Sequence, residues 1–411
     1  MNGHRSAQGR GKERCSLERT PDTTGAFAVA IDAAATPSLS DHIMTTATTA
    51  PATIAPAATA PAIDEAALGA LLGKAVVDIG AVMQAPLILI GNRLGLYRVL
   101  AEGPLTTAEL AARTGTVERY VREWVRGQAA AGYVTYDAAT DRYTLSPEQA
   151  MIFAQQGSPT YLMAGFELAL TMGKGESRLE AAFRTGQGIG WHEHDEHLSC
   201  SIARFFEPGY RANLLSAWIP ALHGVHEKLR AGARVADVGC GHGISTLLMA
   251  DAYPESSFVG FDYHEGSIAA ARADARAAGL EGRASFERAS AKDYPGRDFD
   301  LVTMFDCLHD LGDPVGAAVR VRESLAADGT WMIVEPRAGD RVEDNLNPVG
   351  RVYYSASTLV CTPTSLSQEV GLALGAQAGE QAIRAVTQEA GFTRFRRAAE
   401  TPFNLVFEVR P

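Results

Sequence analysis

The chain has 411 residues, of which 46% are apolar and 21% charged, and its formal net charge is −11. These proportions are typical of a globular protein, and the length allows about two or three domains. The negative charge argues against a surface that binds nucleic acid or anionic membranes as a whole. By their spacing the five cysteines form neither a disulfide framework nor a zinc motif, and we expect no apolar run of the roughly 20 residues that span a bilayer. We therefore expect a cytoplasmic protein without a membrane partner.

The N-terminal segment, residues 1–62, is rich in Ala, Thr and Pro and poor in large apolar side chains. Such a composition buries too little surface to offset the entropy of ordering, so we predict a disordered tail. Met44 offers an alternative translation start, which leaves open whether residues 1–43 are translated.

Residues 63–150 are predicted to form a winged-helix domain. Apolar residues recur at helical spacing from Ile63, a Gly103-Pro104 pair ends the second predicted helix, and two short β segments close the region. The expected elements are helices from Ile63 to Val77, Pro86 to Leu100 and Ala108 to Arg113, a longer helix that contains Trp124, and strands Tyr133–Tyr136 and Arg142–Leu145. Residues 151–230 are predicted to form a mostly helical connector that lines a cleft.

Residues 231–411 alternate apolar strands with amphipathic helices, which predicts a parallel sheet with helices on both faces. The last two strands, 393–398 and 404–409, have no helix between them and predict an antiparallel hairpin. The fold class is therefore α/β: a Rossmann-like, doubly wound sheet with an antiparallel C-terminal hairpin, after a winged-helix, mostly helical N-terminal domain. The expected parallel strands are Arg234–Val238, Ser257–Asp262, Ala284–Ala289, Phe299–Phe305 and Gly329–Glu335.

A glycine-rich loop, Asp237 to Gly243, follows the first of these strands and precedes a helix. Glycines let the backbone turn tightly and approach a ligand closely. The loop lacks the G-x-G-x-x-G spacing of dinucleotide sites, and the carboxylate of Asp237 would serve a pyrophosphate poorly but a cationic aminoacyl ligand well. We predict that it binds such a cofactor, against the alternative of an ordinary strand–turn–helix corner. The predicted contacts are Asp237, Gly239, Cys240, Gly241 and Gly243.

Asp262 stands at the tip of the second strand and is followed by Tyr263. An acid in this position of a doubly wound sheet can accept hydrogen bonds from both ribose hydroxyls, and its distance from the glycine loop is close to the roughly 20 residues expected. We assign Asp262 and Tyr263 to the cofactor site. The alternative for Asp262 alone is a helix N-cap.

These elements resemble class I S-adenosylmethionine methyltransferases from about Ala231 to the C-terminus. With the winged-helix segment, the chain is similar to plant and bacterial small-molecule O-methyltransferases. The resemblance implies S-adenosylmethionine as cofactor, a small-molecule methyl acceptor and a homodimer formed through the winged helix. It also places Ser290 and Ala291 beside the adenine, although an acid is common in the family where this chain has Ser290.

The fourth strand ends in Phe305 and Asp306, which we expect beside the cofactor because ligands lie beyond the carboxyl ends of parallel strands. The following CLHDLGDP segment is similar to the one that holds the catalytic base in those O-methyltransferases, here His309, and the flanking acid matches Glu335. A phenol of pKa near 10 must lose its proton during methyl transfer, and a histidine of pKa about 6.5 can accept it. The alternatives are that His309 only caps the next helix, or that methyl transfer needs no base.

Two other features carry further predictions. The run His192–His197 does not fit the H-E-x-x-H zinc pattern, so we expect a polar loop and no metal. Arg119, Arg122 and Arg126 share a helix face that a winged-helix regulator sensing S-adenosylmethionine would place on DNA, but Glu118 and Glu123 interleave with them, so nucleic acid is not expected. A nucleotide-dependent oxidoreductase is a third hypothesis.

The insertion at 340–367 is predicted to be either a long substrate lid or a dimer contact. Neither the acceptor nor whether methylation is O-, N- or C-directed follows from the sequence.

Overall fold

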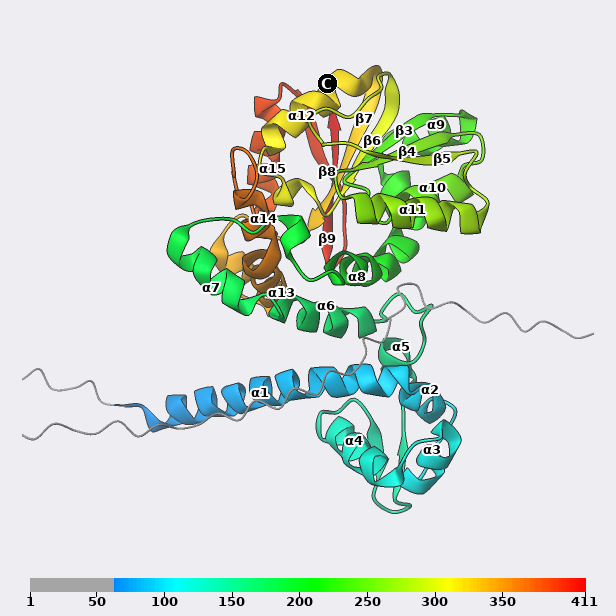
Figure 1. Cartoon of the computed structure of the whole chain (residues 1–411), viewed down its shortest axis with the longest axis vertical. Coiled ribbons are helices and arrows are strands. Elements are labelled where there is room, and N and C mark those ends of the chain that lie inside the picture. The colour runs from blue at the N-terminus through cyan, green and yellow to red at the C-terminus, as the bar shows by residue number, and fades with distance from the viewer. Residues whose placement is uncertain (1–62) are drawn as a thin grey trace, which may run out of the picture. The chain divides into compact units, whose positions relative to one another are not determined.

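A computed structural model describes residues 63–411, so the predicted disordered tail lies outside the described residues. The chain divides into two units, of which one ends at Val76 and the other begins at Val77. The expected fold class is confirmed: a seven-stranded mixed sheet follows a helical winged-helix region (Figure 1).

The winged-helix region consists of helices packed on a two-stranded hairpin. Thr106 caps α3 through a capping box with Glu109. Trp124 of α4 is buried and donates its indole N–H to the carbonyl of Leu87 at 2.8 Å. The elements are α1 (Glu65–Arg93), α2 (Leu96–Leu100), α3 (Thr107–Thr114), α4 (Glu118–Ala130), β1 (Thr135–Asp137) and β2 (Arg142–Thr144).

The expected helix boundary at Pro86 is wrong, because α1 continues through Pro86 to Arg93. Ile88 is fully buried in the turn after the proline, and tertiary packing there outweighs the lost backbone hydrogen bond. The chain instead breaks at Gly95, whose φ of +72° a side chain would disfavour.

The absence of a long apolar run is also corrected. Helix α1 is long and apolar enough to cross a membrane by length and composition, and none of its most apolar stretch is buried. Length and composition alone do not assign it to a membrane, because mostly buried core helices and signal sequences pass the same test.

The connector is helical, as expected. Its helices are α5 (Pro147–Phe153), α6 (Met163–Gly173), α7 (Glu176–Thr185), η1 (Trp191–Glu193), α8 (Leu198–Asn213), the π-helical turn η2 (Leu214–Trp218), η3 (Ile219–Ala221) and α9 (Val225–Ala231).

The large sheet has the strand order β5-β4-β3-β6-β7-β9-β8, in which β9 pairs antiparallel with both β7 and β8. The strand order reverses between β3 and β6, and in doubly wound sheets the ligand crevice lies outside such a switch point. The strands are β3 (Arg234–Val238), β4 (Ser257–Asp262), β5 (Ala284–Arg288), β6 (Phe299–Phe305), β7 (Leu325–Pro336), β8 (Arg394–Glu400) and β9 (Asn404–Arg410).

Helices cover both faces of this sheet (Figure 1). Met249 and Ile268 bury one face, and Ala317 and Ile383 bury the other. The helices are α10 (Ile244–Ala252), α11 (Glu265–Ala278), α12 (Pro314–Ser324) and α15 (Gly379–Glu389).

The insertion at 340–367 is not a long loop, which corrects that part of the prediction. Asn347 caps a helix that Pro348 begins, and a π-helical turn continues it. The segment contains η5 (Val342–Asn345), α13 (Pro348–Ala356), η6 (Ser357–Cys361) and α14 (Thr362–Leu366).

Candidate active site

The glycine loop forms a cradle at the carboxyl end of β3. Gly239, Gly241 and Gly243 all have positive φ, a conformation that other residues rarely adopt. A Cβ at Gly243 would lie 2.5 Å from the ring of Phe286, whereas a Cβ at Gly241 would meet no atom within 4 Å. The loop is therefore packed from behind at Gly243 and open at Gly241, as a backbone that receives a ligand must be.

Asp237 lies behind this loop and is 1% exposed. Its Oδ2 accepts hydrogen bonds from Ser245 (2.7 Å) and Thr246 (2.6 Å), and its Oδ1 accepts one from Thr303 (2.9 Å). Burial raises the pKa of Asp237, although the three hydroxyls partly offset this. Through these hydrogen bonds Asp237 connects the start of the loop to α10 and β6. Its contact with a cofactor stays a prediction.

Asp262 lies at the tip of β4 and faces the same loop. Its Oδ2 accepts the N–H of Gly241 at 2.9 Å, and its Oδ1 accepts the N–H of His264 at 2.8 Å. Burial raises the pKa of Asp262 while these two N–H groups lower it. Tyr263 beside it is 45% exposed. The open glycine and the carboxylate thus share one edge of the cradle, which fits a ligand that carries a ribose.

Ser290 and Ala291 follow β5 on the other side of β4. The Ser290 hydroxyl accepts the N–H of Lys292 at 3.1 Å, and Ala291 packs partly against the core. Their proposed contact with adenine stays a prediction.

At the end of β6, Asp306 follows the buried Phe305 and adopts φ = +49°. Its carboxyl group accepts hydrogen bonds from Tyr210 (2.8 Å) and Asn404 (3.0 Å). Burial and then the nearby Glu335 raise the pKa of Asp306 to about 8. Sequence reasoning missed Asn404 because it begins β9, which only the sheet order brings beside β7 and near Asp306.

His309 and Glu335 form a buried pair. The His309 Nδ1 lies 2.5 Å from Glu335 Oε2, and Glu335 Oε1 accepts the N–H of Leu308 at 3.0 Å. Burial disfavours the imidazolium, but the carboxylates of Glu335 and Asp310 outweigh it and raise the pKa of His309 well above its usual range. His309 lies in the 3-10 turn η4 (Leu308–Asp310) and does not cap α12, whose N-cap is Asp313.

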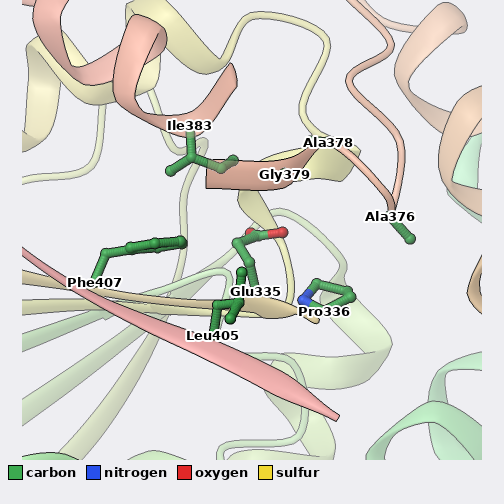
Figure 2. A pocket seen from close by; sticks show the side chains of 8 residues that line it. All are labelled: Glu335, Pro336, Ala376, Ala378, Gly379, Ile383, Leu405 and Phe407. Atoms are coloured by element: carbon green, nitrogen blue, oxygen red, sulfur yellow. The ribbon is translucent and has the colours of Figure 1, made fainter. Parts of the chain in front are cut away.

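A small pocket surrounds Glu335 with mostly aliphatic and aromatic side chains (Figure 2). Because these neighbours offer no charge, Glu335 depends on His309 and the Leu308 N–H for its electrostatic partners. The lining residues are Glu335, Pro336, Ala376, Ala378, Gly379, Ile383, Leu405 and Phe407.

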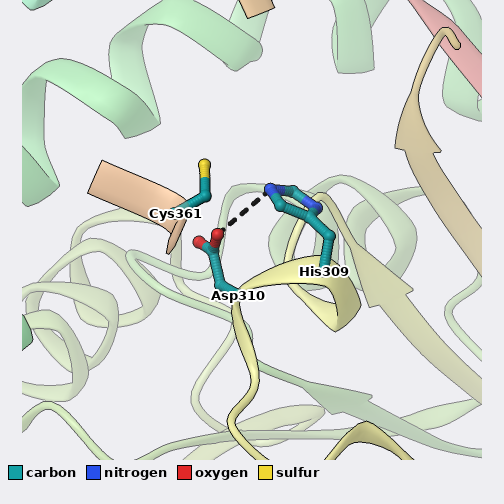
Figure 3. A group of neighbouring side chains, drawn as sticks. All are labelled: His309, Asp310 and Cys361. Carbon is teal, nitrogen blue, oxygen red and sulfur yellow. Dashed lines mark ion pairs between the residues drawn. The ribbon is translucent and has the colours of Figure 1, made fainter. Parts of the chain in front are cut away.

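The other ring nitrogen of His309 faces Asp310 and Cys361 (Figure 3). Nε2 lies 3.1 Å from Asp310 Oδ1. Burial, and then the Asp310 carboxylate, raise the pKa of the Cys361 thiol to about 12. Sequence reasoning missed Cys361, because it lies in the insertion far along the chain and stands in no recognisable motif.

The other candidate residues from the sequence do not gather into one site. Glu193 accepts the N–H of Gly190 at 2.7 Å and Asp195 pairs with Lys174 at 3.0 Å, so these members of the run His192–His197 have separate partners. On α4, Arg119 pairs with Glu123 (2.5 Å) and Arg122 with Glu118 (2.6 Å), which partly neutralises the face proposed for DNA.

Two family models match the chain. Residues 229–390 match a methyltransferase domain, and residues 82–155 match an Rv2258c-like winged HTH domain. An O-methyltransferase of Streptomyces lavendulae, SfmM3, is 26% identical over 264 residues, which are 62% of this chain and 77% of that protein. The 27-O-demethylrifamycin SV methyltransferase of Amycolatopsis mediterranei is 30% identical over 171 residues, 40% of this chain and 55% of its own. The matched stretches span between 24% and 77% of such curated relatives.

Solved structures share the fold at low identity. Human N-acetylserotonin methyltransferase in complex with S-adenosylmethionine has a TM-score of 0.62 and 16% identity, with 86% of this chain and 99% of that chain covered. The mitomycin 7-O-methyltransferase MmcR has a TM-score of 0.58 and 19% identity, with 85% and 100% covered. The chain therefore carries a methyltransferase domain with the class I S-adenosylmethionine methyltransferase fold, preceded by a winged helix-turn-helix domain.

Proposed function

We propose that the protein transfers a methyl group from S-adenosylmethionine to a hydroxyl group of a small molecule, with His309 as general base. The observation that carries the proposal is the buried His309–Glu335 pair beside the cofactor cradle. Several relatives are named as O-methyltransferases, which supports a hydroxyl acceptor.

The cradle residues suit this cofactor by their chemistry. Bound S-adenosylmethionine would supply an electrophilic methyl group on a sulfonium sulfur. The open backbone at Gly241 and the carboxylate of Asp262 would hold its ribose. A positively charged ligand nearby would favour the charged forms of the buried acids Asp237 and Asp306, whose pKa values burial raises.

The acceptor hydroxyl must approach Nε2 of His309, because Nδ1 is bonded to Glu335. The acceptor hydroxyl would displace Asp310 from Nε2. Only the Glu335 carboxylate would then remain beside the ring to favour the imidazolium. When the acceptor hydroxyl is methylated, Nε2 of His309 would accept its proton. Glu335 then stabilises the imidazolium that results.

The test is methyl incorporation from radiolabelled S-adenosylmethionine into a panel of phenols, alcohols and matched amines. His309→Ala should lower turnover of the best acceptor about 10²- to 10⁴-fold, while the affinity for S-adenosylhomocysteine stays within about threefold. His192→Ala, which changes an exposed histidine, is the matched control. Unchanged turnover in His309→Ala would refute the base role, and a preference for amines would refute O-methylation.

We also propose that the protein is a homodimer formed through α1. Val77, Val82 and Met83 of this helix are 71%, 72% and 69% exposed, and a cluster of apolar side chains this open to water is typical of an interface. Val82→Glu should shift the sedimentation coefficient from dimer to monomer, whereas Val342→Glu, at a comparably exposed valine elsewhere, should not. A monomeric wild-type protein at micromolar concentration would contradict this proposal.

A further inference from the structure

Three potential metal ligands converge beside the active site from separate parts of the chain. His309 and Asp310 come from η4, and Cys361 is the last residue of η6. One ligand atom from each lies within 4.8 Å of the other two (Figure 3). His309 is 3% and Cys361 7% exposed, so the cluster differs from the exposed acidic groups that often gather without an ion.

The donor set is the one that zinc prefers. Thiolate, imidazole and carboxylate are its usual ligands, and at normal bond lengths the ligand atoms of a tetrahedral site lie roughly 3.5 Å apart. The distance from Nε2 to Asp310 Oδ1 is already 3.1 Å. The three ligand atoms already lie within 4.8 Å of one another, so a small movement of the Cys361 side chain would complete a three-ligand site with one open position.

The existing contacts of Asp310 and His309 also suit an ion at this position. Asp310 Oδ1 is buried and forms an ion pair with Nε2 of His309 at 3.1 Å, so both atoms already face the position that an ion would take. Glu335 binds the far nitrogen of His309, which is the carboxylate–histidine–metal arrangement that orients metal-binding imidazoles.

We propose that His309, Asp310 and Cys361 bind a zinc ion, and that the bound ion prevents methyl transfer. Binding forms bonds from zinc to Nε2, to an Asp310 oxygen and to Sγ, and it releases the Cys361 thiol proton, together with any proton on Nε2, to solvent. No electron is transferred. The inhibition rests on the proposed function, because zinc would occupy the His309 nitrogen that takes the proton of the substrate hydroxyl. The binding of zinc itself does not depend on the proposed function.

Cobalt(II) is the spectroscopic probe, titrated into the purified full-length protein freed of metal by chelation. We expect one equivalent to bind and to produce a near-ultraviolet thiolate-to-cobalt charge-transfer band with visible bands of tetrahedral intensity. Zinc should displace the cobalt stoichiometrically. Cys361→Ser should abolish the charge-transfer band, and Glu335→Gln should weaken zinc binding about 10- to 100-fold.

Control variants separate this site from other ligands. His192→Ala and Cys307→Ser should keep the cobalt spectrum, because neither residue belongs to the cluster. Asp310→Asn offers a second disruption if Cys361→Ser fails to fold, and it should reduce zinc affinity at least tenfold. A charge-transfer band that persists in Cys361→Ser, or no stoichiometric binding at micromolar metal, would overturn the site.

The two proposals fail in different ways. If zinc displaces cobalt stoichiometrically but leaves turnover unchanged, the base role of His309 and the inhibition would be refuted, while the site itself would stand. Loss of turnover in His309→Ala without metal binding to the wild-type protein would leave the base role intact and refute the zinc site.

Discussion

Asp262 is the residue whose replacement tests the cofactor cradle most directly. If its carboxylate accepts both ribose hydroxyls, Asp262→Ala removes two hydrogen bonds to a charged group, each worth about 1.5–3 kcal/mol. The sum of about 3–6 kcal/mol corresponds to a loss of affinity of about 10²- to 10⁴-fold. Gly241 and His264 also lose the acceptor of their N–H groups, which loosens the loop and acts in the same direction.

The assay is a calorimetric titration with S-adenosylhomocysteine, beside urea unfolding to show that the variant is folded under the same conditions. Asp251→Ala removes an exposed acid from α10 and so controls for the change in net charge. It should leave the affinity within about twofold. If Asp262→Ala binds within threefold of wild type, Asp262 does not hold the ribose and the assignment of the cradle is wrong.

Two further predictions concern stability. Gly243→Ala should lower the free energy of unfolding by about 2–5 kcal/mol, from about 1–2 for the left-handed backbone and about 1–3 for the Cβ that would lie 2.5 Å from Phe286. Gly279 also has a positive φ, but a Cβ there would meet no atom within 4 Å, so Gly279→Ala should lower the free energy of unfolding only by the backbone contribution. If urea unfolding shows equal losses for Gly243→Ala and Gly279→Ala, the packing argument is wrong. Asp306 has a folded pKa of about 8, above its unfolded value, so its contribution favours folding at low pH and is lost as pH rises from about 4 to about 8. Relative to wild type, Asp306→Asn should therefore gain about 1.4 kcal/mol per pH unit between pH 5 and 8, and parallel stability–pH curves would refute the raised pKa.

Local signals in the sequence are sufficient to predict the sheet and the centre of the site. The strands β3, β4 and β6 begin and end where the apolar runs predict, because parallel strands buried on both faces need continuous apolar sequence. Asp262 ends one of these strands, and the glycine loop and His309 follow the ends of two others. A parallel sheet brings these ends to one edge, so the positions of the strands also give the positions of these residues.

Where tertiary packing competes with local preference, the sequence pattern misleads. Pro86 is typical of a helix boundary, but the buried turn at Ile88 keeps α1 continuous. The insertion at 340–367 has the pattern of a loop, but capping at Asn347 and packing of Tyr353 make it helical. The apolar length of α1 is also hidden in the sequence, because the pattern around Pro86 divides the helix into two shorter segments.

The sequence by itself determined the fold class and the order of the candidate site residues along the strand ends, because both depend on periodicity and on single positions at those ends. Only the tertiary structure decided which distant side chains face those positions: Tyr210 and Asn404 on Asp306, and Cys361 on His309. These contacts join helices and strands that are far apart along the chain. No local pattern encodes them, since each depends on how whole elements pack.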